Sequence, residues 1–585
     1  MGRTLRTLLI VSLALVLLGS LIAWTVQTQG GTITVRDVRF IGANGTPMSA
    51  LLYIPPNATS ETPAPGILAV HGYINSREVQ SGYAIEYARR GYVVLSLDQT
   101  GHGYSGGAAF ANGFGGPDGL RYLRSLDIVD PDNIGLSGHS MGGWALLAAA
   151  ATFPDDYKSV MLQGSSTGAP FAMEGSPEWP RNLGLVFSEY DEFSQLMWAS
   201  AVPGNAPQGE KMMSVFGTTE PVQPGQLYGS IEQGTARWFQ QPPVTHAADH
   251  LSATAIGHAI DWMQQTLEGG SPLPVTDQVW RVKEYGTLLA LIGFVMFLFP
   301  VGAMLLRLPY FARLNDDLPE ARPVRGVGWW IAAALTALIP ILTFFPLNNL
   351  INAEGYQASA LFPQNLTTGI MYWALGNALI TLVLFLAWHF LSNRNTGATA
   401  RNYGLTWGKR LHWGRIGKSF LLAALIAFIG YLLLALMDFF FKIDFRFWMV
   451  GFKLMSPLQF RIFLGYLIPF TIFFLVLATA LHGQLRLGDT VPLWKAMLVN
   501  VALLITGFIL LMLVQYIPLF SGGTMTFNEP LLTIVAYQFI ALLAIVALIS
   551  TFFFRRTGHI YVGAFLCAIL VTWYIVAGQA THYAF

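Results

Sequence analysis

Nine long apolar runs dominate the pattern of hydrophobic and polar positions along the chain. The first extends from about Leu8 to Val26. A helix needs about 20 apolar residues to cross a bilayer, and each run is long enough to do so. The pattern therefore predicts nine membrane-spanning helices. After Tyr285 the other eight runs cover about residues 286–306, 327–347, 369–392, 419–441, 460–482, 494–518, 531–553 and 560–580.

Residues 32–270 lie between the first and second apolar runs and have the pattern of a soluble domain. Short runs rich in β-branched residues alternate with helical stretches, which favours a mostly parallel sheet with helices on both faces. The dipeptide Asn44-Gly45 predicts a hairpin turn between the first two strands. The expected strands are Thr32–Phe40, Met48–Ile54, Gly66–Val70, Tyr92–Leu97, Asn133–Leu136, Lys158–Leu162 and Leu183–Phe187.

These patterns divide the chain into four parts. We expect an N-terminal transmembrane anchor over 1–31, an α/β domain over 32–270, a linker over 271–285, and a membrane domain of about eight helices over 286–585. A cleaved signal peptide is the alternative for the first run. Signal segments have a shorter apolar core of about 7–15 residues and a small-residue cleavage site, so the anchor is favoured. Either interpretation sends the α/β domain outward.

The composition agrees with a chain that is largely hidden from water. It is 53% hydrophobic and only 11% charged, whereas soluble proteins are about 25% charged. The net charge of +1 gives no reason to expect a nucleic-acid partner. The one cysteine, Cys567, can form neither an internal disulfide nor a cysteine metal cluster. We recognise no metal-binding motif or phosphate-binding loop, and expect no metal and no cofactor.

Lys and Arg are concentrated in alternate loops, which orients the helices. Arg3 and Arg6 predict a cytoplasmic N-terminus and an extracytoplasmic α/β domain in a multi-pass protein of the cell membrane. One loop disagrees, because Lys442, Arg446 and Lys453 would then lie outside. Its mixture of aromatic and charged residues suggests an interfacial helix. The loops expected in the cytoplasm are 307–325, 394–418 and 555–556, and those expected outside, with the C-terminus, are 348–368 and 521–530.

The strongest chemical motif is Gly138-His139-Ser140-Met141-Gly142, which fits G-x-S-x-G. It follows an expected strand and precedes the Ala-rich helical stretch Trp144–Thr152. A serine on a sharp strand-to-helix turn forms a nucleophile elbow, in which small flanking residues leave the hydroxyl exposed. Ser140 is therefore the candidate nucleophile. The alternative is a structural turn in a domain that has lost activity.

A serine hydroxyl is a weak nucleophile and needs a base that a carboxylate orients. In folds with this elbow, the acid and then the histidine follow the serine along the chain. Residues 183–192 end in Glu189, Asp191 and Glu192, and residues 244–251 contain His246 and His250. These two segments supply the candidates for the acid and the base.

Over about residues 33–267 the sequence resembles the α/β-hydrolase family. The acid of that family commonly ends a G-x-x-D pattern, which Ser188-Glu189-Tyr190-Asp191 matches except for Ser in place of Gly. The resemblance implies Asp191 as the acid, with Glu189 as the reserve. Glu192 is expected to be a solvated helix start. The family's base commonly lies about sixteen residues before an aromatic of the last helix. That spacing implies His246, ahead of Trp262, and leaves His250 as the alternative base.

Two further motifs fit the same resemblance. His71-Gly72-Tyr73 resembles the family's oxyanion signature, which implies that the backbone N–H groups of Tyr73 and Met141 stabilise the developing charge. Asp98–Ser105 fits D-x-x-G-x-G-x-S and is expected to shape a loop near the site. The segment 193–241, between acid and base, is expected either to form a mobile apolar cover or to pack onto the sheet.

The resemblance implies a serine hydrolase that cleaves a small acyl ester, thioester or peptide-like substrate through an acyl-enzyme. The lipid bilayer is the other expected partner. Two alternatives from other classes stay open. One is a transporter or lipid-handling membrane protein whose hydrolase domain processes its cargo, and the other is a sensor or scaffold with an inactive domain.

Overall fold

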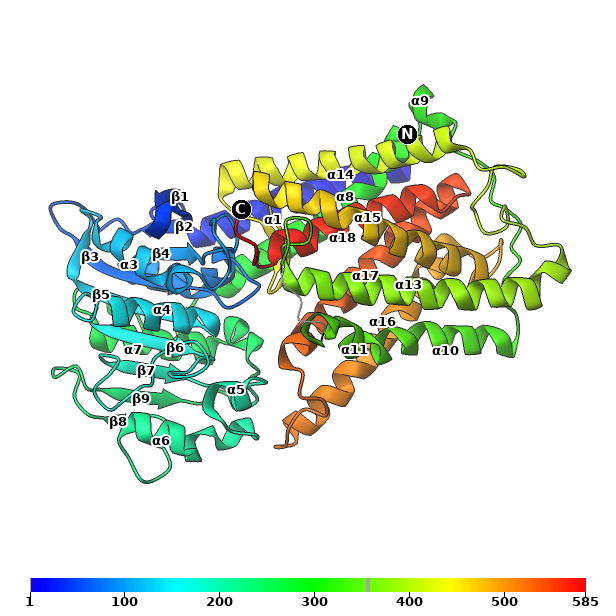
Figure 1. Cartoon of the computed structure of the whole chain (residues 1–585). Helices are drawn as coiled ribbons and strands as arrows, with labels where there is room; N and C mark the ends of the chain where they lie inside the picture. Colours follow the sequence, from blue (N-terminus) through cyan, green and yellow to red (C-terminus); the bar gives the residue numbers. More distant parts are fainter. Residues whose placement is uncertain (1, 354–357) are drawn as a thin grey trace.

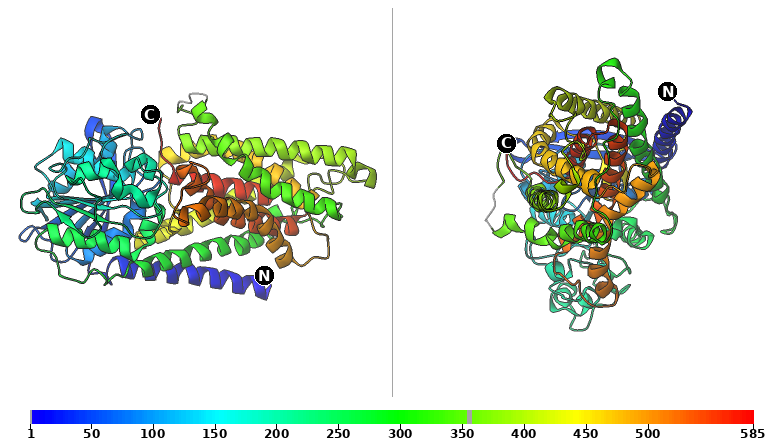
Figure 2. Two further views of the ribbon diagram at one scale, coloured as in Figure 1. Left: turned by 90° about the horizontal axis from the view of Figure 1, so that it is seen from below. Right: turned by 90° about the vertical axis from the view of Figure 1, so that its right-hand side faces the viewer.

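The computed structural model describes residues 2–353 and 358–585, which form a sheet domain joined to a helical bundle (Figure 1). The sheet domain lies at one end of the bundle, whose long helices run side by side away from it (Figure 2). The predicted fold class, an α/β domain plus a region of many apolar helices, is confirmed, although this region also contains one short β-hairpin. Met1 lies outside the described residues. So do residues 354–357, which belong to the loop 348–368 that was predicted to be external.

Nine strands form one sheet in the order β1-β2-β4-β3-β5-β6-β7-β9-β8. β2 pairs antiparallel with β1 and β4, the pairs from β4 through β9 are parallel, and β8 closes the far edge antiparallel. Asn44 has a positive φ of 55° in the turn between β1 and β2, as the predicted hairpin requires. The strands are β1 (Thr34–Ile41), β2 (Pro47–Ile54), β3 (Ala64–Val70), β4 (Val93–Asp98), β5 (Val129–His139), β6 (Ser159–Gln163), β7 (Leu183–Val186), β8 (Leu227–Tyr228) and β9 (Arg237–Gln240).

Helices cover both faces of the sheet because its central strands are apolar on both sides. Along β3, Leu68 and Val70 join the core beneath α3 and α4, whereas Ile67 and Ala69 join the core beneath α2 and α7. This layering leaves the carboxyl ends of the parallel strands free to form a site, the usual place in such folds. The covering helices are α2 (Ser81–Arg89), α3 (Gly116–Arg124), α4 (Met141–Thr152) and α7 (Ala253–Thr266).

The segment between the candidate acid and base packs onto the sheet. It contains α5 (Ser194–Trp198) and α6 (Glu210–Phe216), and then β8 and β9 extend the sheet. Trp198, Met212 and Phe216 are buried in the core that α4 also covers. Of the two interpretations of residues 193–241, the structure favours packing over a mobile cover.

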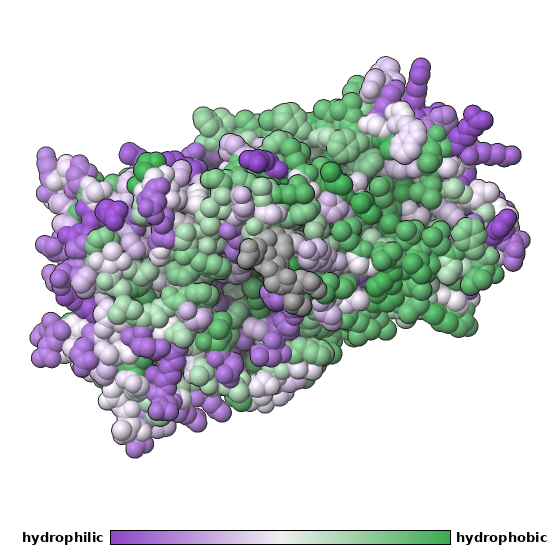
Figure 3. Space-filling view, viewed as in Figure 1, coloured by the Kyte–Doolittle hydropathy of each residue, from purple (hydrophilic) through white to green (hydrophobic). Residues whose placement is uncertain are grey.

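Within the described residues, eight helices are long and apolar enough to cross a membrane, and a bent pair makes a ninth if it is taken as one span. The bent pair is the predicted run 327–347, in which α10 and α11 meet at Thr343 and the axis turns by 45°. Figure 3 shows an apolar surface along the bundle and polar residues at the end opposite the sheet domain. The bundle helices are α1 (Arg3–Gln27), α8 (Trp280–Leu305), α10 (Val327–Leu342), α11 (Phe344–Asn348), α13 (Asn365–Leu391), α14 (Trp413–Phe441), α15 (Pro457–Thr479), α16 (Leu493–Phe520), α17 (Pro530–Thr557) and α18 (Tyr561–Gly578).

The first helix packs closely along α8 through small residues. A Cβ added to Gly19 would lie 2.4 Å from the carbonyl oxygen of Gly286, and one added to Gly293 would lie 2.8 Å from that of Ser12. Small residues let two helix backbones approach each other in lipid. The two helices therefore pack backbone to backbone, and the anchor over 1–31 stays a prediction.

The structure corrects the predicted end of the linker at residue 285. α8 already begins at Trp280, whose side chain is buried in the core beneath α2. The Glu86 carboxylate of α2 accepts hydrogen bonds from the N–H groups of Val279 (2.7 Å) and Trp280 (3.1 Å). A carboxylate that satisfies the free N–H groups at a helix start stabilises that start. The first turn of α8 is therefore packed against the sheet domain.

The loop that disagreed with the charge rule is a β-hairpin, so its interpretation as an interfacial helix is wrong. β10 (Phe445–Phe447) pairs antiparallel with β11 (Val450–Phe452). Arg446 forms an ion pair with Asp444, and Lys453 lies 3.2 Å from the Glu78 carboxylate of the sheet domain. Both positive charges are thus paired with carboxylates, one of them across the contact between the hairpin and the sheet domain.

Candidate active site

Ser140 stands at the turn from β5 to α4 with φ 56° and ψ −125°, a strained conformation for a residue other than glycine. Two glycines make this turn possible. A Cβ on Gly138 would lie 2.7 Å from the backbone of Gly142, and one on Gly142 would lie 2.2 Å from the carbonyl oxygen of Val70. The turn has the strand–turn–helix form of a nucleophile elbow. Ser140, at the tip of this turn, lines a cavity.

Asp191 and His246 lie on two loops that meet at the carboxyl edge of the sheet. His246 Nδ1 is 2.8 Å from Asp191 Oδ2, and both side chains are buried. The other carboxylate oxygen of Asp191 accepts the N–H of Phe193 at 2.8 Å. Tyr190 and Thr245 form an isolated parallel bridge that holds the two loops together. The imidazole is thus held by Asp191, and not by the reserve acid Glu189, two residues earlier.

His250, the alternative base, lines the same cavity. Its ring packs against that of His139, with centroids 4.3 Å apart, and edge-on against Tyr83 at 5.8 Å. Among the described residues, neither ring nitrogen of His250 has a hydrogen-bond partner. Since an imidazole acts as a base when a carboxylate orients it, the geometry favours His246.

The loop after β3 comes close to the serine, as the oxyanion signature implies. A Cβ on Gly72 would lie 3.0 Å from Ser140 Cβ, so glycine allows the approach. Tyr73 and Met141 line the cavity beside Ser140, and the Tyr73 hydroxyl is 3.0 Å from His582 Nε2. The backbone N–H groups of Tyr73 and Met141 remain the predicted oxyanion donors.

These residues surround one cavity of about 250 Å³. Its polar lining residues include Ser140, Asn75 and the three histidines His139, His246 and His250, and the rest of its wall is mostly apolar and aromatic. Three wall residues come from the bundle. The lining consists of Gly72, Tyr73, Ile74, Asn75, Phe110, His139, Ser140, Met141, Trp144, Pro170, Phe171, Phe193, Leu196, Met197, His246, Ala247, His250, Met449, Leu531 and Ile534.

Glu192 is not solvated as predicted, and its position corrects that expectation. Its side chain is buried, with Oε2 accepting the backbone N–H of His246 (2.8 Å) and Oε1 accepting the hydroxyl of Tyr516 (2.7 Å). Burial and the Asp191 carboxylate raise the pKa of Glu192 to about 7, against the effects of His246 and Tyr516. Tyr516 belongs to α16, so a bundle helix reaches the loop of the candidate base. No sequence signal marks a contact between residues 324 positions apart.

The sequence did not predict the hydrogen bonds of His139 and Ser188 close to the candidate base His246. His139 Nε2 donates to the carbonyl oxygen of His246 at 2.8 Å. Ser188, which replaces the glycine of the acid pattern, donates to the Asp249 carboxylate. Burial lowers the pKa of His246, and the carboxylates of Glu192 and Asp249 oppose the shift. A lowered pKa keeps the imidazole neutral, which is the form that accepts a proton.

Within residues 2–353 and 358–585, no group of three or more His, Cys, Asp or Glu side chains is arranged to hold a metal ion.

Residues 65–243 match the family model of the α/β hydrolase fold. The match contains the elbow at Ser140 and the acid loop at Asp191, and it coincides with the centre of the mostly parallel sheet. The sheet domain therefore has the α/β hydrolase fold, and the chain joins it to a region of apolar helices, as the resemblance implied.

No curated protein matches the chain significantly. A solved structure of a hypothetical protein from Pseudomonas aeruginosa is 28% identical with a TM-score of 0.21; the match covers 23% of this chain and 43% of that one, under half of its length. An esterase from Pyrococcus furiosus is 16% identical with a TM-score of 0.30, over 41% of this chain and 96% of that one. A predicted CIB-like hydrolase from Thermoplasma acidophilum is 15% identical with a TM-score of 0.29, over 40% and 99%.

Proposed function

We propose that the protein is a membrane-anchored serine hydrolase that cleaves an ester, thioester or amide bond through an acyl-enzyme on Ser140. The observation that carries the proposal is the 2.8 Å hydrogen bond between Asp191 and His246 at the cavity that Ser140 lines. An imidazole held by a carboxylate beside a serine on a nucleophile elbow is the arrangement that activates the hydroxyl.

The reaction follows from this arrangement. His246 takes the proton of the Ser140 hydroxyl as Oγ attacks the substrate carbonyl carbon. The N–H groups of Tyr73 and Met141 stabilise the negative oxygen of the tetrahedral intermediate. The intermediate collapses as His246 returns the proton to the leaving alcohol, thiol or amine. Water then attacks the acyl-enzyme with His246 again as the base, which releases the acid and restores Ser140. Asp191 keeps the imidazole in the required tautomer throughout.

Turnover of a soluble short-chain ester by the purified full chain tests this proposal. We expect p-nitrophenyl butyrate to be hydrolysed, Ser140→Ala to abolish turnover, and Asp191→Asn to lower kcat by on the order of 10⁴-fold. Ser125→Ala changes an exposed serine and serves as the matched control. Turnover by Ser140→Ala at the wild-type rate would place the nucleophile elsewhere.

We also propose that the hydrolase domain lies on the extracytoplasmic side. The Arg-rich loops lie at the end of the bundle away from that domain (Figure 1), which supports this orientation under the positive-inside rule. The one native cysteine, Cys567, is buried, so single introduced cysteines can be mapped. A membrane-impermeant maleimide should label Ser60→Cys on intact cells and Asn395→Cys only after permeabilisation. The opposite pattern would reverse the orientation.

Lipid handling by the bundle is the second candidate function, and a cavity supports it. A space of about 100 Å³ lies between the bundle helices, bounded by the bent helix at Pro340 and by Asn377 of α13. A photoactivatable phospholipid that labels α10 and α13 selectively, in a Ser140→Ala chain, would favour this function. Labelling spread evenly over the outward-facing helices would count against it.

A further inference from the structure

Three residues of the bundle form part of the wall of the candidate active-site cavity. Met449 lies at the tip of the β10–β11 hairpin, and Leu531 and Ile534 lie in the first turns of α17. The remaining lining residues come from the hydrolase domain, so the cavity is complete only when both domains are in place. The three bundle residues are all apolar.

The hairpin tip is fixed next to the candidate base. Trp448 Nε1 donates to the carbonyl oxygen of Ala247, the residue after His246, at 2.8 Å. The Trp448 ring stacks on Tyr537 of α17, with centroids 5.1 Å apart. The Tyr537 hydroxyl in turn donates to Met449 Sδ at 3.0 Å. Met449 therefore has a defined place in the wall.

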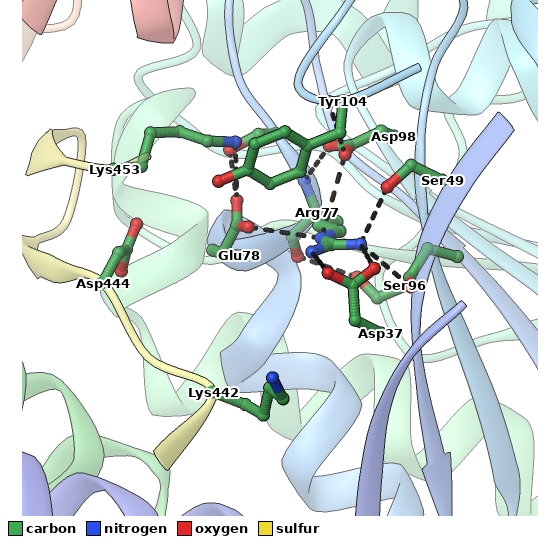
Figure 4. Close-up of polar contacts among 12 residues, drawn as sticks. Asp37, Ser49, Arg77, Glu78, Ser96, Asp98, Tyr104, Lys442, Asp444 and Lys453 are labelled. Carbon is green, nitrogen blue, oxygen red and sulfur yellow. Dashed lines mark hydrogen bonds and ion pairs between the residues drawn. The ribbon is translucent and has the colours of Figure 1, made fainter. Parts of the chain in front are cut away.

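A buried ionic cluster holds the foot of the same hairpin against the hydrolase domain (Figure 4). Lys453 lies 3.2 Å from Glu78, and its ammonium sits 4.4 Å from the centre of the Tyr104 ring. Asp98 accepts the backbone N–H groups of Arg77 (2.9 Å) and Tyr104 (3.0 Å). Tyr104 of the D-x-x-G-x-G-x-S motif, which begins at Asp98, thus contacts the foot of the hairpin, and its hydroxyl donates to the carbonyl oxygen of Leu454 at 3.0 Å.

The residues that line the cavity indicate which kind of substrate fits it. Besides Ser140, the histidines and Asn75, most of the lining residues are apolar or aromatic, including Met449, Leu531 and Ile534 from the bundle. At about 250 Å³ the space exceeds the ~150 Å³ of an apolar cavity that takes up benzene. Apolar side chains at its margin, Phe171 and Leu196, are 50% and 46% exposed. An acyl chain can bury its apolar surface against such a wall, whereas a short polar group cannot.

We infer that the bundle supplies the acyl-chain wall of the active site, and that the substrate is a long-chain acyl ester, thioester or amide whose chain lies between the two domains. The inference rests on the proposed function of Ser140. Met449, Leu531 and Ile534 are then specificity-determining residues. Each methylene buried in the cavity should raise kcat/KM about fourfold, until the space is full.

A chain-length series tests the inference on the full chain in nanodiscs. For p-nitrophenyl esters from butyrate to palmitate, wild-type kcat/KM should rise with chain length up to a limit. Leu531→Trp puts a larger side chain into the cavity. If this side chain excludes two methylenes of the substrate, the ratio of kcat/KM for long-chain to short-chain esters should fall about sixteen-fold. Met449→Ala enlarges the cavity and should move the limit to longer chains. Ala541→Trp, at an exposed position of α17, is the matched control and should leave the ratio unchanged.

The outcomes separate the two proposals. Hydrolysis of butyrate with no preference for longer chains, or with a preference that neither Leu531→Trp nor Met449→Ala alters, overturns the inference and leaves the serine hydrolase intact. If the folded protein hydrolyses no ester at all, the proposed function fails and the inference fails with it. If Leu531→Trp does not fold, Met449→Ala decides alone.

Discussion

The ion pair between Glu78 and Lys453 makes a quantitative prediction about how the two domains hold together. The side chains of Lys453 and Glu78 are only 2% and 12% exposed. Although burial opposes it, Lys453 and Arg77 hold the pKa of Glu78 well below its ordinary value. The Glu78 carboxyl is therefore ionised at neutral pH. Arg77 has two further carboxylate partners, Asp37 and Asp98. Among the described residues, Glu78 is the one carboxylate that forms an ion pair with Lys453.

Glu78→Gln keeps the size of the side chain but leaves the Lys453 ammonium buried without a counter-charge. Breaking a buried pair from one side costs about 3–5 kcal/mol. In a domain of this size the unfolding temperature should fall by on the order of 10 °C. The double variant Glu78→Gln/Lys453→Met removes both charges, and should be more stable than Glu78→Gln alone by about 1–3 kcal/mol.

Thermal unfolding of the purified full chain, with limited proteolysis to detect separation of the domains, measures these differences. Glu61→Gln, at an exposed position of the hydrolase domain, controls for loss of one negative charge and should leave the unfolding temperature within about 1 °C. A double variant as unstable as Glu78→Gln, or less stable, would refute the argument, because the loss would not then arise from an unpaired buried ammonium.

Three further predictions concern the site and the first helix. The folded pKa of Glu192 is about 7, against about 4.3 in the unfolded chain. Protonation of Glu192 therefore stabilises the fold fully below pH 4, and up to about 4 kcal/mol of this stability is lost as the pH rises through 7. Unfolding at pH 5 and pH 8 should show this loss in the wild type, and a smaller loss in Glu192→Gln. The lowered pKa of His246 should place the acid limb of kcat/KM below pH 6.5, because the neutral ring is the active form; a limb above pH 7 would contradict this assignment. Gly19→Leu should destabilise the protein by about 1–3 kcal/mol, because even a Cβ would lie 2.4 Å from Gly286 O, whereas Leu18→Ala at an exposed position should have little effect.

The local motifs of the hydrolase domain were predictable from the sequence because each depends on neighbours in the chain. The small residues around Ser140 determine the turn, and the strand before it determines where the turn lies. Asp191 and His246 followed from the order and spacing of the resemblance, and the structure brings these two side chains together. Apolar length alone located the bundle helices, although it could not show that the run at 327–347 is bent at Thr343.

Contacts across the two domains could not be predicted in this way. Lys453 and Glu78 lie 375 positions apart, and a lysine in a loop has the same local pattern whether it faces lipid or a carboxylate. Glu192 has the sequence context of a solvated helix start, but its environment depends on Tyr516 of a distant helix. Met449 is an ordinary apolar residue in sequence, and only the hairpin's docking brings it to the cavity.

The central claim is that Ser140 is an activated nucleophile, and covalent labelling by a fluorophosphonate probe tests it most directly. Membranes that contain the wild-type chain should be labelled, and mass spectrometry should locate the adduct on Ser140. Ser140→Ala and His246→Ala should abolish labelling, while His250→Ala should retain it. A folded wild-type protein that is never labelled, or an adduct on another residue, would contradict the account.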